Sequence, residues 1–136
     1  MGRVFFNTRK NVHALDGAYT MLASDSGKTF MLSATGGTVA ITLLPAATLE
    51  EGWHCKFVTK EDTPSNAITN GAGSAIIDMV MKDPGGNASN STAGTAVSNI
   101  IVGATSTQGD YINVFCDGST YYAECLSGID DAITTS

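Results

Sequence analysis

The chain of 136 residues is poor in charge, in proline and in long apolar runs. Charged residues make up 15% of it and proline occurs 3 times, whereas hydrophobic residues make up 43%. This composition is not that of a disordered segment, and a chain of this length can fold without a metal or a disulfide. No apolar run reaches the roughly 18 residues of a transmembrane helix, and the first residues do not predict a signal peptide. We therefore expect no membrane contact.

Basic residues are scarce as well. The chain has 7 Lys and Arg against 13 Asp and Glu, a formal net charge of −6. A general nucleic-acid-binding protein needs a basic face that displaces counterions from phosphates, so we expect no nucleic-acid partner. The charge is uneven, because residues 1–10 hold Arg3, Arg9 and Lys10 and no acid. This basic leader predicts contact with an acidic partner surface or with the acidic body of its own chain.

Threonine, serine and glycine are abundant, with 17 Thr, 12 Ser and 15 Gly. β-Branched residues pack well on a pleated sheet, and glycine permits tight turns. Residues 38–44 and 53–59 alternate with the period of a half-buried strand, and the second run places Trp53, Cys55 and Phe57 on one face. Roughly eight to ten short strands without a long helical period predict an all-β fold. We expect an antiparallel β-sandwich or a jelly-roll-like barrel.

Local signals predict the connections. Thr35-Gly36-Gly37 reads as a turn that pairs 28–33 with 38–44, and residues 45–52 read as one helical turn opened by proline and closed by glycine. Residues 67–69 predict a short strand, and 97–102 another. Residues 75–81 are ambiguous between strand and helix, and the polar run from 83 to 94 predicts a loop.

The clearest local signal is a hairpin near the C-terminus. Residues 111–116 and 121–126 are rich in aromatic and branched side chains, and Asp117-Gly118-Ser119-Thr120 between them is a hairpin turn signal. If Gly118 and Ser119 form the loop, Cys125 faces Ile112.

The three cysteines match no zinc or redox motif and are expected to be buried hydrophobic side chains in strands. The hairpin register puts Cys116 about 13 Å from Cys125, which excludes a disulfide between them. A bridge from Cys55 to either of the other two stays open.

Catalytic and metal-binding motifs are weak. Ser26-Gly27-Lys28-Thr29 ends like a phosphate-binding loop, but the glycine needed earlier in that motif is Leu22 here, which favours a simple turn. His13 and His54 stand alone, and no serine has a nucleophile-elbow context. We predict no enzyme activity, no catalytic residue, no cofactor and no metal site. The weaker candidates are the acidic pairs Glu50-Glu51, Glu61-Asp62 and Asp130-Asp131, read as solvated turns, and Asp78, Asp83 and Asn87, which lack calcium-loop spacing.

The N-terminal segment and the aromatic residues are the candidate contact elements. Adjacent Phe5 and Phe6 point to opposite faces of an extended strand, so one chain can hardly bury both. This favours an arm on a neighbouring protein, although an ordinary first strand explains it equally well. Trp53 and Tyr121-Tyr122 could form a sugar-stacking platform, but inward strand positions for Trp53 and Tyr121 favour the core.

Several segments in order resemble a recurrent β-module of structural proteins of tailed bacteriophages, namely capsid decoration (cement) proteins and tail-fibre domains. They span residues 23–126 and are listed here in chain order: Ala23-Ser24-Asp25-Ser26-Gly27-Lys28-Thr29-Phe30, Val39-Ala40-Ile41-Thr42-Leu43-Leu44-Pro45-Ala46-Ala47, Glu51-Gly52-Trp53, and Gly109-Asp110-Tyr111 through Asp117-Gly118-Ser119-Thr120-Tyr121-Tyr122. The resemblance implies a β-sandwich that trimerises and has no catalytic residue.

The resemblance implies a virion structural protein that is made in the host cytoplasm and seated on the outer capsid surface. There it would bind the major capsid protein as a homo-oligomer, expected to be a trimer, and stabilise the shell. The expected organisation is an arm (1–16), a sandwich (17–128) and a C-terminal tail (129–136). The alternative is a tail-fibre or tail-tip receptor-binding or carbohydrate-binding module. The predicted contact residues of the arm are Arg3, Phe5, Phe6, Arg9 and Lys10.

Overall fold

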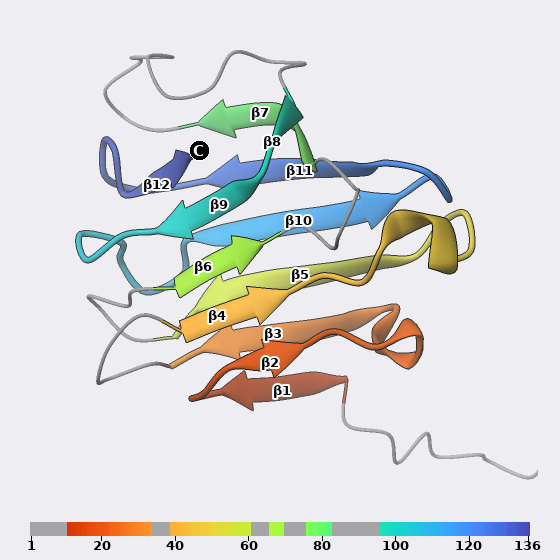
Figure 1. Cartoon of the computed structure of the whole chain (residues 1–136). Helices are drawn as coiled ribbons and strands as arrows, with labels where there is room; N and C mark the ends of the chain where they lie inside the picture. Colours follow the sequence, from red (N-terminus) through yellow and green to blue (C-terminus); the bar gives the residue numbers. More distant parts are fainter. Residues whose placement is uncertain (1–10, 34–38, 61–65, 70–75, 83–95) are drawn as a thin grey trace, which may run out of the picture.

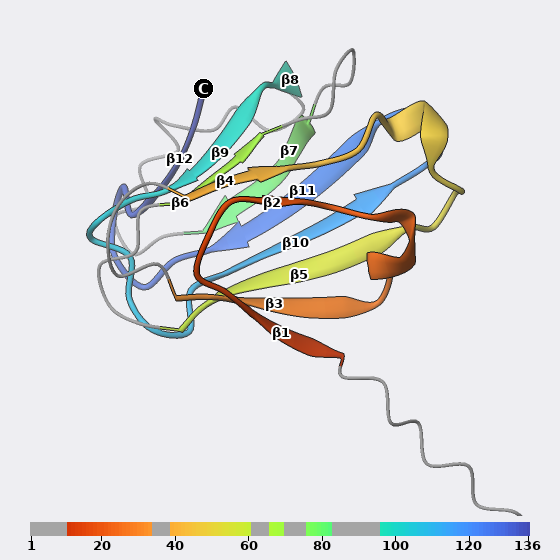
Figure 2. The same ribbon diagram turned by 60° about the horizontal axis from the view of Figure 1, so that its bottom comes forward.

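The computed structural model describes residues 11–33, 39–60, 66–69, 76–82 and 96–136. They form two stacked, open β-sheets (Figures 1 and 2), which confirms the expected all-β sandwich and not the barrel. The described residues contain twelve strands, more than the eight to ten expected, because the predicted strand at 97–102 is split, two short strands precede residue 28 and one follows residue 126.

The larger sheet has seven strands and the smaller has five. In spatial order the seven-stranded sheet consists of β1 (Val12–Leu15), β3 (Lys28–Leu32), β5 (His54–Thr59), β10 (Tyr111–Cys116), β11 (Tyr121–Leu126), β7 (Ile76–Lys82) and β8 (Ala96–Val97). The five-stranded sheet consists of β12 (Ile133–Thr135), β9 (Asn99–Val102), β6 (Asn66–Thr69), β4 (Val39–Thr42) and β2 (Tyr19–Thr20). Two short 3-10 helices, η1 (Ala23–Asp25) and η2 (Ala46–Thr48), lie in the connections.

From β1 to β7 the chain alternates between the two sheets, so neighbouring strands such as β3 and β5 run parallel. The predicted hairpin between 28–33 and 38–44 is therefore wrong, since β3 and β4 lie in opposite sheets. A glycine-rich turn permits either arrangement, and both strands bury their apolar side chains in the same core. The expected antiparallel pairing is also corrected, because five strand pairs are parallel and five antiparallel.

Two consecutive turns of this winding have the same length. Lys28 pairs with Cys55 in one sheet and Val39 with Asn66 in the other, and both steps, 28 to 55 and 39 to 66, are 27 residues. The match is visible in the sequence, where Ala-Ile-Thr occurs at 40–42 and again at 67–69. Windings of equal length place identical residue types next to each other on neighbouring strands, as in a solenoid.

The core lies between the sheets and consists of the inward-facing residues of both. Ile41, Ile68 and Ile100 occupy one rung of the smaller sheet and are 0% exposed. On the opposite sheet the Phe30 and Phe57 rings stack with centroids 5.6 Å apart. Burying a large side chain completely stabilises the fold by about 1.5–3 kcal/mol, so these rungs hold the two layers together.

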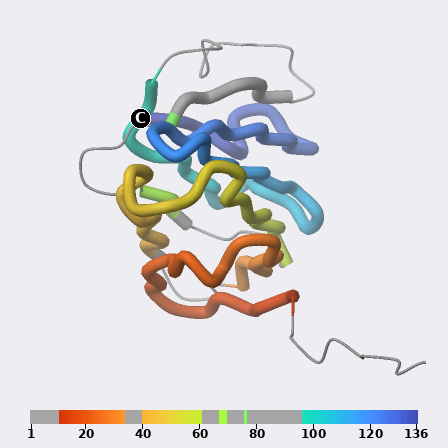
Figure 3. The backbone as a smooth tube through the Cα atoms, turned by 90° about the vertical axis from the view of Figure 1, so that its right-hand side faces the viewer, coloured from red at the N-terminus to blue at the C-terminus, as the bar shows by residue number. Residues whose placement is uncertain are grey.

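The end of the sandwich that faces the viewer in Figure 3 carries η1, η2 and the turn between β10 and β11. The predicted helical turn at 45–52 is η2, which Pro45 opens, and Gly52 follows it with φ of 90°. The ambiguous segment 75–81 is a strand, β7, whereas the predicted loop from 83 to 94 lies outside the described residues.

The sandwich extends beyond the expected boundaries of 17–128. β1 lies within the segment expected to be an arm, and β12 lies within the expected tail. Neither of the two described helices is long enough to cross a bilayer.

Candidate interaction surface

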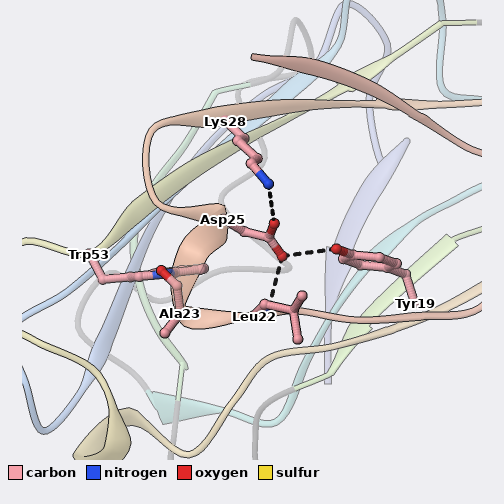
Figure 4. Close-up of polar contacts among 6 residues, drawn as sticks. All are labelled: Tyr19, Leu22, Ala23, Asp25, Lys28 and Trp53. Carbon is pink, nitrogen blue, oxygen red and sulfur yellow. Dashed lines mark hydrogen bonds and ion pairs between the residues drawn. The ribbon is translucent and has the colours of Figure 1, made fainter. Parts of the chain in front are cut away.

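The carboxylate of Asp25 is completely buried and fully hydrogen-bonded (Figure 4). Its Oδ1 atom lies 2.7 Å from Lys28 Nζ, and its Oδ2 atom accepts hydrogen bonds from the Tyr19 hydroxyl at 3.0 Å and the Leu22 amide at 2.8 Å. Burial by itself would raise the pKa of Asp25, but these hydrogen bonds and the Lys28 charge hold the pKa below its usual value. The group ties η1 to β2 and β3.

Asp110 has the same character at the opposite end of the sandwich. Its Oδ2 atom accepts from Ser106 Oγ at 2.7 Å and from the Thr107 amide at 2.8 Å, and its Oδ1 atom accepts from the Gly128 amide at 2.8 Å. Burial would raise its pKa, and these hydrogen bonds lower it below the usual value. Both carboxylates already serve several donors, so their geometry is that of structural groups.

The outward side of the seven-stranded sheet, called the A-face below, is the most distinctive surface of the described residues. The alternation of burial along β1, β3, β5, β10 and β11 turns every second side chain outward. On these five strands the A-face consists of Val12, Ala14, Thr29, Met31, His54, Lys56, Val58, Tyr111, Asn113, Phe115, Tyr122, Glu124 and Leu126, and the name is used below for these residues.

An aromatic rung crosses the A-face next to the β10–β11 turn. His54, Phe115 and Tyr122 are cross-strand neighbours, and the Phe115 and Tyr122 rings stack with centroids 5.1 Å apart. The Tyr122 hydroxyl donates to Asp117 Oδ2 at 3.1 Å. The turn therefore holds the aromatic pair in one orientation.

The middle rung holds both charged residues of the A-face. Lys56, Asn113 and Glu124 lie side by side on β5, β10 and β11. Asn113 Nδ2 donates to Glu124 Oε2 at 3.2 Å, and Lys56 Nζ lies 4.2 Å from the centroid of the Tyr111 ring. One positive and one negative charge cancel, so the described A-face is neutral on a chain of net charge −6.

The third rung is apolar. Met31, Val58, Tyr111 and Leu126 lie on adjacent strands. Val12, Phe115 and Leu126 on the A-face are 57%, 40% and 38% exposed, and they account for most of the exposed large hydrophobic residues in the described part of the chain. Val12 lies in the middle rung, Phe115 in the aromatic rung and Leu126 in the apolar rung, so exposed apolar side chains are spread over the A-face. Exposed apolar surface marks interaction sites, and aromatic residues and methionine are enriched in protein interfaces whereas charged residues are depleted.

The opposite surface lacks such anchors. The outward residues of the five-stranded sheet are also uncharged where described, but they are mostly small, as Ala40, Thr42, Ala67 and Thr69 illustrate. Binding energy concentrates in large aromatic and arginine side chains, so the A-face is the stronger candidate.

A shallow depression of about 280 Å³ interrupts the A-face between β3, β5 and β10. Apolar residues such as Phe115 and polar residues such as His54 both line it. The residues that line it include Gly27, Thr29, His54, Lys56, Asn113 and Phe115. Its size and mixed lining suit a small polar ligand with one apolar face.

The residues singled out from the sequence fall into three groups in the structure. Trp53 and Tyr121 are 4% and 0% exposed, so they are core residues as expected and cannot form a sugar platform, whereas Tyr122 is partly exposed. The Ser26-Gly27 turn precedes β3, as expected, with Gly27 at φ of 80°. The arm residues Arg3, Phe5, Phe6, Arg9 and Lys10 lie outside the described residues.

The candidate catalytic and metal-binding residues are not brought together where the structure describes them. His54 Nδ1 lies 2.9 Å from the Gly52 carbonyl oxygen, and the His13 ring packs on Phe30. In the described ranges no three His, Cys, Asp or Glu side chains are grouped as metal ligands. Asp83 and Asn87 lie outside those ranges, as does the side chain of Asp78.

All three cysteines are buried thiols, which confirms the expected core positions and the absence of a Cys116–Cys125 bridge. Cys55 also has no disulfide partner. Burial raises the pKa of the Cys55 and Cys116 thiols, which disfavours the reactive thiolate.

The A-face was not predicted as a site, although its signal is present in the sequence. The hairpin register that places Cys125 opposite Ile112 also places Tyr122 opposite Phe115 and Glu124 opposite Asn113. Strand alternation then turns these residues outward. What the sequence could not reveal is that β5 lies beside β10, because this pairing joins segments more than fifty residues apart.

Known proteins add nothing to this geometry: no family model matches the chain, and no curated protein or solved structure is significantly similar to it.

Proposed function

We propose that this chain is a non-catalytic structural protein that works by assembly, and that it is a decoration protein on the outer capsid surface of a tailed phage. The observation that carries the assembly role is the A-face, a neutral surface with exposed aromatic and aliphatic side chains on an acidic chain. The phage assignment rests on the resemblance of residues 23–126 in sequence order.

In this proposal the chain binds the major capsid protein and other copies of itself, and the resemblance implies a trimer. A protein that binds only the assembled shell stabilises that shell by mass action. Several attached copies in one oligomer raise avidity without new kinds of contact. The contact with the shell is assigned to the arm, where Arg3, Arg9 and Lys10 supply positive charge and Phe5 and Phe6 supply aromatic anchors.

The test is co-sedimentation of the purified chain with shells of tailed-phage major capsid protein that lack a decoration protein. We expect the chain to sediment with the shells, and replacement of the five arm residues by alanine to abolish this while the circular dichroism spectrum stays unchanged. A double variant with Leu22→Ala and Ile129→Ala, which removes exposed apolar side chains outside the arm and the A-face, is the matched control and should sediment like the parent. Attachment by the arm variant would refute the arm assignment, and absence of binding by the parent would refute the decoration role.

The second candidate is a receptor-binding or carbohydrate-binding module of a phage tail. It is favoured by Phe115, which is 40% exposed and borders the depression beside the polar groups of His54 and Asn113. Sugars stack an apolar face on aromatic rings while their hydroxyls hydrogen-bond to polar neighbours. Titration against an array of glycans tests it: Phe115→Ala should abolish binding, whereas Leu126→Ala on the far rung should retain it. A parent chain that binds no glycan rules the candidate out.

A further inference from the structure

The two charged residues of the A-face are placed symmetrically about β10. Lys56 and Glu124 flank the strand β10 in the same rung, one on β5 and the other on β11, with Asn113 between them. Neighbouring strands lie about 4.8 Å apart, so the backbone positions of Lys56 and Glu124 lie on opposite sides of β10 at about the same distance from it.

We propose that the A-face pairs with the A-face of a second copy of this chain about a two-fold axis that is parallel to β10 and lies midway between the two faces. Rotation about such an axis exchanges the β5 side with the β11 side while each rung stays at its own level. Lys56 of one copy then faces Glu124 of the other, and the same contact occurs twice, as in every isologous interface.

The same rotation matches the other two rungs. In the aromatic rung Phe115 meets its own counterpart and His54 meets Tyr122, while in the apolar rung Tyr111 meets its counterpart and Val58 meets Leu126. Among the described residues, aromatic side chains therefore face aromatic ones, apolar side chains face apolar ones, and charged side chains meet in the middle rung alone. Sheets packed face to face lie about 10 Å apart with interdigitated side chains.

Electrostatics favours a second copy over an unrelated partner. Two chains of net charge −6 repel each other in most orientations. The A-face is neutral where described, so it adds no net repulsion when two copies meet there. The proposed rotation places each Lys56 opposite a Glu124, and these opposite charges attract. A strongly basic partner would find neither an acidic cluster nor a net negative charge among the described residues of this face.

The pairing goes beyond attachment to a shell and concerns the chain alone. It replaces the trimer implied by the resemblance with a dimer as the unit of assembly. It also covers the depression beside Phe115, so a dimer and a glycan compete for this face.

Charge reversal tests the pairing on the full-length chain. Lys56→Glu and Glu124→Lys each place like charges opposite one another at both symmetry-related contacts, so each variant alone should dimerise about a hundredfold more weakly. A mixture of the two variants should form a mixed dimer. In that dimer the carboxylate introduced at position 56 of one variant faces the ammonium group introduced at position 124 of the other. At the second contact the unchanged Glu124 of the first variant faces the unchanged Lys56 of the second.

The readout is sedimentation equilibrium of each variant, of the mixture and of Glu51→Lys, a reversal at an exposed residue outside the A-face. The parent chain and the Glu51→Lys control should be dimers, and circular dichroism should show all variants folded. A monomeric parent, a trimeric parent, single reversals that dimerise normally, or a mixture that stays monomeric would each overturn the two-fold pairing. Shell binding is measured separately, so either proposal can fail without the other.

Discussion

At the scale of single residues, the described polar interior depends on two carboxylates that serve several donors at once. Asp25 joins a lysine, a tyrosine and a backbone amide, and Asp110 joins side chains and backbone from the two segments 106–107 and 127–128. A buried charge is costly unless it is paired and hydrogen-bonded. Each site therefore fixes its loops to the sheets, and replacing either carboxylate should lower the free energy of unfolding.

Asp110→Asn should lower the free energy of unfolding by about 2–4 kcal/mol. The amide keeps one oxygen acceptor, but its NH2 group cannot accept, so either the Ser106 and Thr107 donors or the Gly128 donor are left unsatisfied in a buried site. Urea denaturation followed by tryptophan fluorescence measures the change. Asp16→Asn, at an exposed residue, should stay within about 0.5 kcal/mol of the parent. Equal stability of the parent and Asp110→Asn would contradict the structural role.

The free energy of unfolding should also decrease as the pH is lowered. The pKa values of Asp25 and Asp110 are lowered in the folded chain, and that of the exposed Asp117 is lowered to about 2 by hydrogen bonds from Ser119, Thr120 and Tyr122. A lowered folded-state pKa adds stability above the unfolded value of about 4, and this stability is lost as the pH falls through the folded-state value.

Urea midpoints measured from pH 7 down to pH 2 test this. The midpoint should hold above about pH 5 and decline below about pH 4. The decline should be shallower in Asp110→Asn, which lacks one of the titrating groups. A flat profile down to pH 2 would show that these carboxylates have the same pKa in both states.

At the scale of elements, the hairpin of β10 and β11 is the part that the sequence predicts best. Its turn signal, strand limits and register all agree with the structure, because a hairpin is determined by neighbouring residues. The placement of β3, β4, β5 and β6 could not be predicted in the same way. Their parallel pairings join residues 27 positions apart, and each strand passes through the opposite sheet in between.

The hairpin turn depends on glycine. Gly118 has φ of 88°, and an added Cβ would approach the Glu51 amide at 3.7 Å, so the strain is in the backbone conformation rather than in a clash. Gly118→Ala should destabilise the chain by about 1 kcal/mol. Gly17→Ala is the matched control, since Gly17 has no strained φ and nothing lies within 4 Å of its added Cβ. Thermal unfolding of the two variants compares them, and equal losses would contradict the turn geometry.

The same contrast between local and distant information applies to the site. Outward positions on β5, β10 and β11 follow from alternation, so the individual residues of the A-face could be predicted from the sequence. Its identity as one surface depends on β5 lying beside β10, which local patterns do not encode. The aromatic residues first considered for a platform, Trp53 and Tyr121, are buried as strand alternation predicts: they face the second sheet, in edge-to-face contact with each other.

At the scale of the whole molecule, the sandwich presents one face suited to large contacts and one made of small side chains. The proposals assign the arm to the shell and the A-face to a second copy. These two contacts use different residues, because the five arm residues precede β1 at one edge of the sheet while the pairing axis is parallel to β10 near its middle.

The most direct test of this account is the mass in solution of the parent chain and of the variant in which Arg3, Phe5, Phe6, Arg9 and Lys10 are replaced by alanine. Light scattering coupled to size exclusion should give twice the chain mass of 14.0 kDa for both proteins. That result would place self-association in the β-sandwich and leave the arm available to a shell. A mass of one chain or of three for the parent, or a dimer that disappears in the arm variant, would contradict the account.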